Sequence, residues 1–193
     1  MEHTSESERS ASAPDIRLRP VGIVRSVLKQ PSLVPKRGDL HWGAGAERAR
    51  EERDAIAELV VDDDLTGILD GIDGFSHLLV LYWAHLVPQQ ARSMTKVHPM
   101  GRKDLPLTGI FATCSPARPN PISVTVVRLL ERRGNVLVVE GLEAVDGSPV
   151  IDIKPYTPYY YRVRDVQVSE WMAQVQRGLG GRPPRSGPAH GKE

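Results

Sequence analysis

The sequence predicts a mainly β protein, a small barrel or a sandwich with a few short helices. Short segments rich in β-branched and apolar residues recur along the chain, and turn residues separate them. These segments do not alternate with long amphipathic helices, which argues against a parallel sheet with helical crossovers. The chain has no internal repeat, so we expect one antiparallel domain.

The expected strands lie in four segments. Residues 16–28 are β-branched and flanked by prolines. Residues 77–87 form a nearly continuous apolar run, too short for a membrane span of about 20 residues, and predict a buried strand. Residues 121–145 predict two strands that meet at Gly134-Asn135, a dipeptide typical of hairpin turns. Residues 149–156 alternate apolar and charged side chains and predict a further strand.

The helices are expected to be few. Residues 44–59 have a helix-favouring composition, although the stretch AIAELVV at their end could equally pair as an edge strand. Residues 65–72 allow a short helical turn. Residues 168–178 predict an α-helix, because Ser169 can cap its start and a glycine follows its last turn.

The composition predicts one domain between two tails. Residues 1–14 and 178–193 are expected to be disordered, and residues 15–177 to form the domain, with a charged insertion near residues 43–64. The formal net charge of +1 excludes a global basic field, so a nucleic-acid surface must be a local patch. A single cysteine excludes an internal disulfide. The first residues lack the apolar core of a signal peptide, and we expect a cytoplasmic protein without a membrane span.

Signatures of nucleotide and metal binding are weak. Residues 43–48 (GAGAER) resemble half of a dinucleotide fingerprint, but Arg48 occupies the third glycine position and no βαβ unit surrounds them. His77 and His85 would stand about 26 Å apart on an extended strand. With one cysteine and no close spacing of His, Asp and Glu, no metal site is expected.

The stretch GIFATCSPARPNPISV (109–124) carries three prolines between two segments that predict strands. Proline fixes φ and donates no hydrogen bond, so this loop is expected to be rigid and unable to pair as a strand. A rigid loop can present Arg118, with its planar fork of donors, and Asn120 to a ligand at little entropic cost. The alternative is a purely structural corner with Arg118 on the surface.

A second polar group follows a predicted turn at Asp146-Gly147. Asp152, Lys154 and Tyr156 occupy alternate positions of one strand and therefore share a face. These side chains can order a ligand or form an exposed strand face, and Asp146 can be a simple turn residue. Basic residues form three local groups that could join into a phosphate-binding patch: Arg25, Lys29, Lys36 and Arg37; Lys96, Arg102 and Lys103; Arg128, Arg132 and Arg133.

Four blocks together resemble the TsaA/TrmO family: VGIVRS (21–26), GFSHLLVLYWAH (74–85), GIFATCSPARPNPISV, and DGSPVIDIKPY (146–156). The resemblance extends over about residues 16–160. Members of that family are S-adenosylmethionine-dependent enzymes that methylate N6 of threonylcarbamoyladenosine at position 37 of tRNA. The resemblance implies a small β-barrel unlike the Rossmann methyltransferases, and a homodimer with the methyl donor near the subunit interface.

The resemblance also implies a set of site residues. The donor would contact Gly38, Asp39, Leu40, His85, Leu86, Phe111, Ala112, Thr113, Cys114, Ser115, Val124, Glu140, Gly141, Leu142 and Glu143. The same pocket would be lined by Arg118, Asn120, Asp146, Lys154 and Tyr156, with Asp146 or Tyr156 as the base and Arg118 on the threonyl carboxylate. Arg25, Lys36, Arg37 and Lys154 would bind the anticodon stem-loop of the tRNA.

The chain departs from the family pattern at two positions. Cys114 replaces the arginine of the usual FATRS, and Ser123 replaces the glycine that usually follows NPI. The missing cation is worth about 1.5–3 kcal/mol if it contacts the donor's carboxylate. The alternatives are therefore a methyltransferase of the same fold with another small-molecule or nucleoside substrate, a non-catalytic S-adenosylmethionine-binding module, and a hydrolase that uses Cys114 as its nucleophile.

Overall fold

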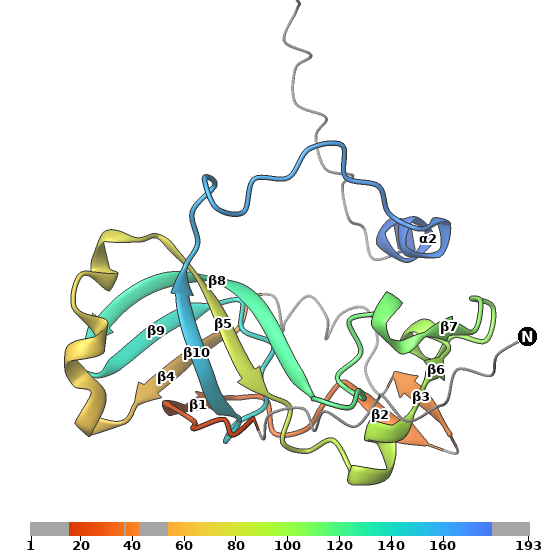
Figure 1. Cartoon of the computed structure of the whole chain (residues 1–193), viewed down its shortest axis with the longest axis horizontal. Helices are drawn as coiled ribbons and strands as arrows, with labels where there is room; N and C mark the ends of the chain where they lie inside the picture. The colour runs from red at the N-terminus through yellow and green to blue at the C-terminus, as the bar shows by residue number, and fades with distance from the viewer. Residues whose placement is uncertain (1–15, 37, 43–53, 179–193) are drawn as a thin grey trace, which may run out of the picture.

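The computed structural model describes residues 16–36, 38–42 and 54–178, and its central feature is a closed antiparallel barrel (Figure 1). The strand order is β1-β10-β5-β8-β9-β4. The six strands are β1 (Gly22–Ser26), β4 (Ile56–Val61), β5 (His77–Trp83), β8 (Ile122–Arg133), β9 (Val136–Glu140) and β10 (Pro149–Pro155). The predicted mainly β barrel with few short helices is confirmed.

The barrel closes because side chains alternate along its strands. On β5, Leu78, Val80 and Tyr82 point inward and are buried, while the residues between them are more exposed. On β4, Leu59 is fully buried in the same core. This period of two explains why AIAELVV is a strand despite its helix-favouring composition. Of the two interpretations of AIAELVV, the strand is confirmed, although β4 pairs on both sides and is not an edge strand. Residues 44–53 of the predicted helix lie outside the described part of the chain.

The predicted hairpin between β8 and β9 is confirmed. Gly134 has φ +63°, which a glycine adopts without strain. The side-chain Nδ2 of Asn135 donates to the carbonyl oxygen of Val61, 2.7 Å away. The turn therefore also ties this hairpin to the end of β4.

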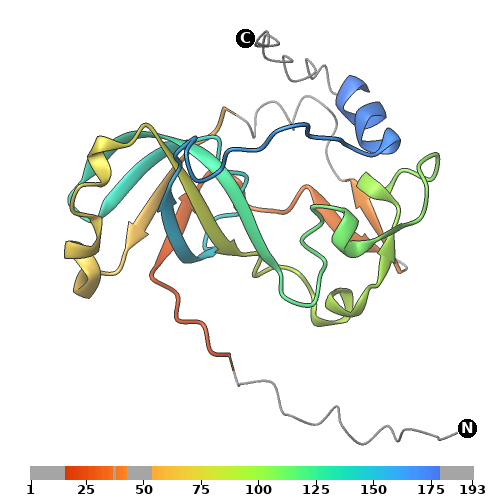
Figure 2. The same cartoon turned by 45° about the horizontal axis from the view of Figure 1, so that its top comes forward.

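A second lobe lies beside one end of the barrel (Figure 2). It holds two short hairpins and three turns of 3-10 helix around a small apolar cluster that includes Leu40, Val97 and Ile110. Its elements are β2 (Leu33–Lys36), β3 (Asp39–Trp42), η4 (Gln89–Ser93), β6 (Lys96–Val97), η5 (Pro99–Gly101), β7 (Thr108–Gly109) and η6 (Ile110–Ala112). Gly101 has φ +67°, and a Cβ there would collide with the backbone of Leu40. The glycine thus lets η5 lie directly against β3.

The remaining elements connect or end the barrel. Two 3-10 helices, η2 (Asp63–Leu69) and η3 (Ile72–Gly74), join β4 to β5, as expected for a short helical turn near 65–72. After β10 an extended segment leads to α2 (Glu170–Gly178), the helix predicted at 168–178. Both views show α2 beside the second lobe (Figures 1 and 2). In the described ranges, no helix has the length and apolarity that crossing a bilayer requires.

Candidate active site

A cavity of about 410 Å³ opens at the end of the barrel where β5 ends and β8 begins. This volume falls within the roughly 300–1,000 Å³ that is usual for small-molecule sites. Three parts of the chain form most of its wall: residues 82–87, the loop 113–118 and the start of β8 at residues 122–125. Residues 31–32 and the turn at 143–148 complete it.

The proline-rich loop is held in a fixed shape by its own hydrogen bonds. Arg118 Nε donates to the carbonyl oxygen of Ser115 at 2.8 Å, and Arg118 Nη2 donates to that of Thr113 at 2.6 Å. The backbone N–H of Ala84 donates to the carbonyl oxygen of Pro121 at 2.8 Å, which fastens the loop to the end of β5. Pro121 itself is fully buried. The loop is therefore rigid, as its prolines predict.

Of the two polar residues predicted to face a ligand from this loop, Arg118 lines the cavity and Asn120 does not. The half-buried side chain of Arg118 lines the cavity. Two of its nitrogens brace the loop, and Nη1 makes none of the hydrogen bonds recorded for the described residues. Because a guanidinium carries five N–H donors, further donors remain for a carboxylate in the cavity. Asn120 is exposed and is not part of the lining.

Another part of the cavity wall combines a histidine with a serine. His85 Nδ1 lies 3.2 Å from Ser148 Oγ, and Ser148 is buried. The backbone N–H of Gly147 donates to the carbonyl oxygen of Val24 at 2.9 Å, which anchors this turn to β1. A Cβ at Gly147 would lie 3.8 Å from His85 Nε2, an ordinary contact distance. The imidazole thus contacts the hydroxyl of a turn that is itself anchored to β1.

The lining suits an amphiphilic, zwitterionic ligand. Tyr82, Leu86 and Val124 supply apolar surface, Arg118 supplies a cation and Glu143 a carboxylate. Serine and threonine hydroxyls from β8 and the loop 113–118 lie between them. A flat apolar group with an attached carboxylate and ammonium would find partners for each part.

Asp146 lies next to this wall but its carboxylate is already engaged. Oδ1 accepts the backbone N–H of Ser26 at 3.0 Å, and Oδ2 pairs with Lys29 Nζ at 2.9 Å. The hydrogen bond from Lys29, followed by that from Ser26, lowers the pKa of Asp146 below its ordinary value. A carboxylate with a lowered pKa is a weaker base, and Asp146 is not part of the cavity lining.

Lys154 and Tyr156 lie at the other end of the barrel. The register pairs Lys154 with Leu79, and the backbone N–H of Tyr156 donates to the carbonyl oxygen of His77 at 2.9 Å. The cavity begins at Tyr82, and β5 spans about 20 Å at 3.3 Å per residue. Lys154 Nζ pairs with Asp152 Oδ2 at 2.5 Å, and this hydrogen bond raises the pKa of Lys154. Within one chain the structure does not bring these two residues to the cavity.

Part of the predicted donor-contacting set lines the cavity: His85, Leu86, Thr113, Cys114, Val124 and Glu143. The lining does not include Gly38, Asp39, Leu40, Phe111, Ala112, Ser115, Glu140, Gly141 and Leu142. Burial in an apolar core explains why two of these residues do not line the cavity. Leu142 is fully buried in the barrel core, and Leu40 is buried in the second lobe.

Of the predicted tRNA-contacting residues, Arg25 and Lys154 are not part of the cavity lining. Arg25 is exposed on β1, in register with Glu58 of β4. Lys36 is the last residue of β2, and Arg37 lies outside the described residues. Among the described residues, no group of three or more His, Cys, Asp and Glu could hold a metal ion.

Sequence reasoning missed more than half of the lining. The missed residues are Pro31, Ser32, Tyr82, Ala84, Val87, Pro116, Ile122, Ser123, Thr125, Val145 and Ser148. A signal for three of them was present. Tyr82 pairs with Ser123, and Val80 with Thr125, so the alternation of β5 and β8 puts these polar groups on the inner face. Polar side chains on the inner face of a small barrel indicate a cavity rather than a packed core.

Fold and site define a class of protein: a small antiparallel barrel with a ligand cavity at one end, unlike nucleotide-binding folds built on a parallel sheet. Residues 23–161 match the family described as the tRNA-methyltransferase O N-terminal domain. The chain belongs to this family, and the predicted resemblance is confirmed.

Relatives and solved structures agree with this assignment. A protein of Methanothermobacter thermautotrophicus, named a probable S-adenosyl-L-methionine-binding protein, is 43% identical over 74% of this chain and 90% of its own length. The tRNA (adenine(37)-N6)-methyltransferase of Escherichia coli is 31% identical over 77% of this chain and 61% of its own length. The crystal structure of TrmO from Pseudomonas aeruginosa superposes with a TM-score of 0.58 at 26% identity, covering 81% of this chain and 61% of that one. The chain thus spans about three fifths of the length of these last two proteins.

Proposed function

We propose that this protein transfers the methyl group of S-adenosyl-L-methionine to N6 of threonylcarbamoyladenosine at position 37 of tRNA. Its family supports the coarser statement, that it is an S-adenosyl-L-methionine-dependent methyltransferase. The name of the Escherichia coli relative supports the more specific proposal, methylation of N6 of the adenosine at position 37 of tRNA. A tRNA substrate and a single reduced cysteine fit a cytoplasmic protein. The observation that carries the proposal is the cavity into which the braced loop presents Arg118.

The residues of the cavity fit the methyl donor. Apolar surface from Leu86 and Val124 suits the adenine, Arg118 suits the carboxylate, and Glu143 suits the positive charges of the ammonium and the sulfonium. When bound, the donor supplies a methyl group on a sulfonium. The rigid loop and the His85 wall would hold donor and acceptor in line and exclude water, which is how positioning lowers the barrier of such a displacement.

The acceptor nitrogen must also lose a proton. Asp146 is paired with Lys29 and has a lowered pKa, so it is less suited to this role than the sequence suggests. Within the cavity of one chain, His85 and Glu143 are groups that can accept a proton. The threonyl carboxylate of the substrate remains a partner for the donors of Arg118 that do not brace the loop.

We further propose a homodimer that pairs the outer faces of β5 and β8. These outer faces are apolar: Leu79, Leu81 and Trp83 on β5 lie opposite Val126, Val124 and Ile122 on β8. Val124 and Val126 are exposed, and Arg92 covers the ring of Trp83. Val124 also lines the cavity, so this interface would border the ligand site. An apolar outer face on a barrel of this size is typical of an interface. A two-fold axis perpendicular to these strands would make the strands of the two protomers run in opposite directions. Lys154 and Tyr156 of one protomer would then approach the cavity of the other.

The decisive experiment is methyl transfer to defined tRNA. The purified protein would be incubated with labelled donor and with tRNA that does or does not carry threonylcarbamoyladenosine at position 37. We expect label only in the modified tRNA, at N6 of the modified adenosine after nuclease digestion and mass spectrometry. Donor binding by calorimetry without transfer to either tRNA would reject the proposal.

A second candidate is a methyltransferase of the same fold with a different acceptor. Cys114 in the cavity wall favours it, because the family pattern has an arginine there and the electrostatics of the site change. Mass spectrometry of nucleosides and small molecules from a strain that lacks the protein separates the candidates. Loss of the methylated threonylcarbamoyladenosine supports the first candidate, and its persistence supports the second.

A further inference from the structure

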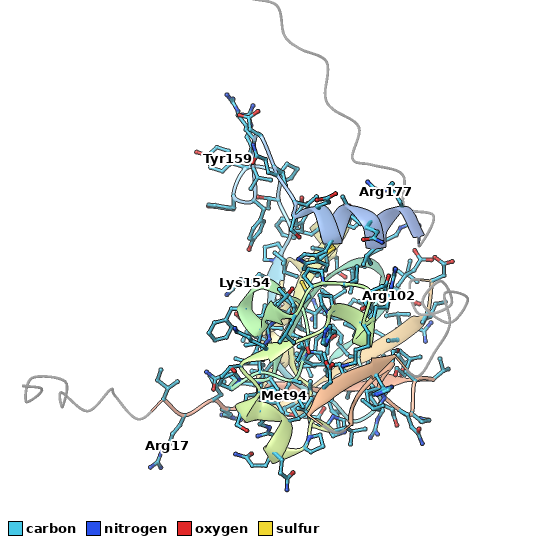
Figure 3. All side chains as sticks on the ribbon, turned by 90° about the vertical axis from the view of Figure 1, so that its right-hand side faces the viewer. Arg17, Met94, Arg102, Lys154, Tyr159 and Arg177 are labelled. Carbon is cyan, nitrogen blue, oxygen red and sulfur yellow. The ribbon has the colours of Figure 1, made fainter. Side chains whose placement is uncertain are left out.

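The segment that follows β10 presents an unusual group of side chains to solvent. Residues 156–164, which we call the tyrosine arm, read YTPYYYRVR. Tyr159 and Tyr160 are 85% and 79% exposed. Figure 3 shows Tyr159 on a part of the chain that stands clear of the rest of the described residues. Large aromatic side chains seldom remain so exposed without a partner to cover them.

The arm has an anchored part and a free part. Tyr161 stacks on Tyr156 with ring centroids 5.5 Å apart and an angle of 7° between the planes. The backbone N–H of Tyr161 donates to the carbonyl oxygen of Thr157 at 3.2 Å. Tyr159 and Tyr160 meet edge to face, with centroids 5.5 Å apart. The stack and the turn therefore fix one ring near the barrel and leave two rings with open faces.

Cationic side chains follow directly. Arg162 and Arg164 are exposed, and neither takes part in an ion pair or hydrogen bond recorded for the described residues. Asp165 is the next charged residue, so the stretch retains an excess of positive charge. Open aromatic faces beside unpaired arginines match the chemistry of a single nucleic-acid strand, whose bases stack on rings and whose phosphates bind guanidinium groups.

We propose that the tyrosine arm binds unpaired RNA, with bases stacking on Tyr159 and Tyr160 and phosphates contacting Arg162 and Arg164. This inference rests on the proposed function, since the RNA would be the anticodon loop that carries the methylated adenosine. It assigns to Tyr159, Tyr160, Arg162 and Arg164 a role separate from the cavity of their own chain. The arm leaves the barrel where Lys154 pairs with Leu79 and the backbone N–H of Tyr156 donates to the carbonyl oxygen of His77, and neither Leu79 nor His77 lines the cavity.

The test measures RNA binding in the absence of donor. The probe is a fluorescein-labelled anticodon stem-loop, compared with a fully paired RNA duplex of equal length. Replacing Tyr159 and Tyr160 together by Ala should weaken stem-loop binding by about tenfold or more, because two bases lose the rings on which they stack. Replacing both by Phe should keep the affinity within about twofold, since the ring faces remain. Replacing Arg162 and Arg164 by Gln should reduce the dependence of affinity on salt.

Control variants separate RNA binding from a protein-docking role. Val163 is 74% exposed in the same arm, and Val163→Ala should leave stem-loop binding unchanged. The inference is overturned if the Tyr→Ala pair binds the stem-loop like wild type, or loses duplex binding equally. It is also overturned if that pair instead dissociates a dimer in sedimentation, since the arm then docks on a second copy.

The same variants distinguish this inference from the proposed function. If wild type methylates tRNA and the Tyr→Ala pair keeps its KM, the inference fails and the proposed function stands. If wild type binds the stem-loop through the tyrosines but transfers no methyl group, the proposed function fails and the inference stands. A raised KM with unchanged kcat supports both.

Discussion

Arg118 Nη2 donates to the carbonyl oxygen of Thr113 across 2.6 Å, inside the wall of the cavity. The side chain that faces the ligand space is thus also the brace of the loop that forms it. Thr113 lines the same cavity. Because the brace already restricts the guanidinium, little further ordering is needed when a carboxylate binds.

Replacing Arg118 by Ala should abolish methyl transfer and leave the barrel folded. The change removes a cation from the cavity and frees two carbonyl oxygens of the loop, and charged hydrogen bonds of this kind contribute about 1.5–3 kcal/mol each. Methyl transfer and donor calorimetry would measure the loss, and circular dichroism would monitor the fold. Arg133→Ala is a matched control, since Arg133 is exposed and pairs with Glu131. Wild-type turnover in Arg118→Ala would reject the role.

The sequence predicts the barrel well because strand alternation is a local signal. It predicts the rigid loop for the same reason, since proline acts on its own neighbourhood. It does not predict where a motif lies along a strand. Tyr156 falls at the far end of the barrel because β10 pairs with β5 in a register that joins Tyr156 to His77, a long-range pairing with no local signature. The carboxylate of Asp39 likewise forms hydrogen bonds with His98 and Lys103, which are 59 and 64 residues away in the sequence.

Replacing Cys114 by Arg should tighten binding of the methyl donor. Cys114 is exposed in the cavity wall, so the longer side chain can reach the ligand space without displacing core residues. One added charged hydrogen bond corresponds to about tenfold or more in the dissociation constant. Calorimetry would measure the dissociation constant of the methyl donor. Cys114→Ser is the control and should retain methyl transfer. Loss of methyl transfer in Cys114→Ser would favour a nucleophilic cysteine.

Replacing Val126 by Glu should dissociate the proposed dimer. Val126 is exposed on the outer face of β8, opposite Leu79 of β5. A charge in the middle of a buried apolar interface is costly, so we expect the dimer dissociation constant to rise by at least about tenfold. Analytical ultracentrifugation would measure it, with Val27→Glu, at an exposed position after β1, as the control. A wild-type protein that sediments as a monomer would contradict the dimer itself.

Two inactive variants should complement each other if the site is shared. In a mixed dimer of Arg118→Ala and Tyr156→Ala, one cavity has both defects and the other has neither, provided that Tyr156 serves the partner's cavity. Each variant alone should therefore be inactive, and an equal mixture should recover part of the wild-type rate. The measurement is methyl transfer after mixing and subunit exchange. If the mixture stays inactive while mixed dimers form, Tyr156 does not act across the interface.

Asp39 should stabilise the second lobe in a pH-dependent manner. Its buried carboxylate accepts the backbone N–H groups of Leu40 and His98 at 2.8 and 3.0 Å, and it pairs with His98 Nδ1 at 2.7 Å and with Lys103 Nζ. Burial alone would raise the pKa of Asp39. The hydrogen bonds from Lys103, His98 and Leu40 outweigh it and hold that pKa well below its ordinary value.

Replacing Asp39 by Asn should therefore lower the free energy of unfolding at pH 7 by about 1.5–3 kcal/mol, the contribution of charged hydrogen bonds, since Asp39 is buried but its partner Lys103 is largely exposed. Because the folded pKa is depressed, the stabilisation is fully present above the unfolded pKa of about 3.9 and is lost as the pH falls through the folded value. Urea unfolding at pH 7 and at pH 3 should show the difference between wild type and Asp39→Asn narrowing at the lower pH. Asp104→Asn, in an exposed pair with Arg102, should leave stability almost unchanged. A difference that stays constant between the two pH values would show that the charge of Asp39 is not what holds the lobe together.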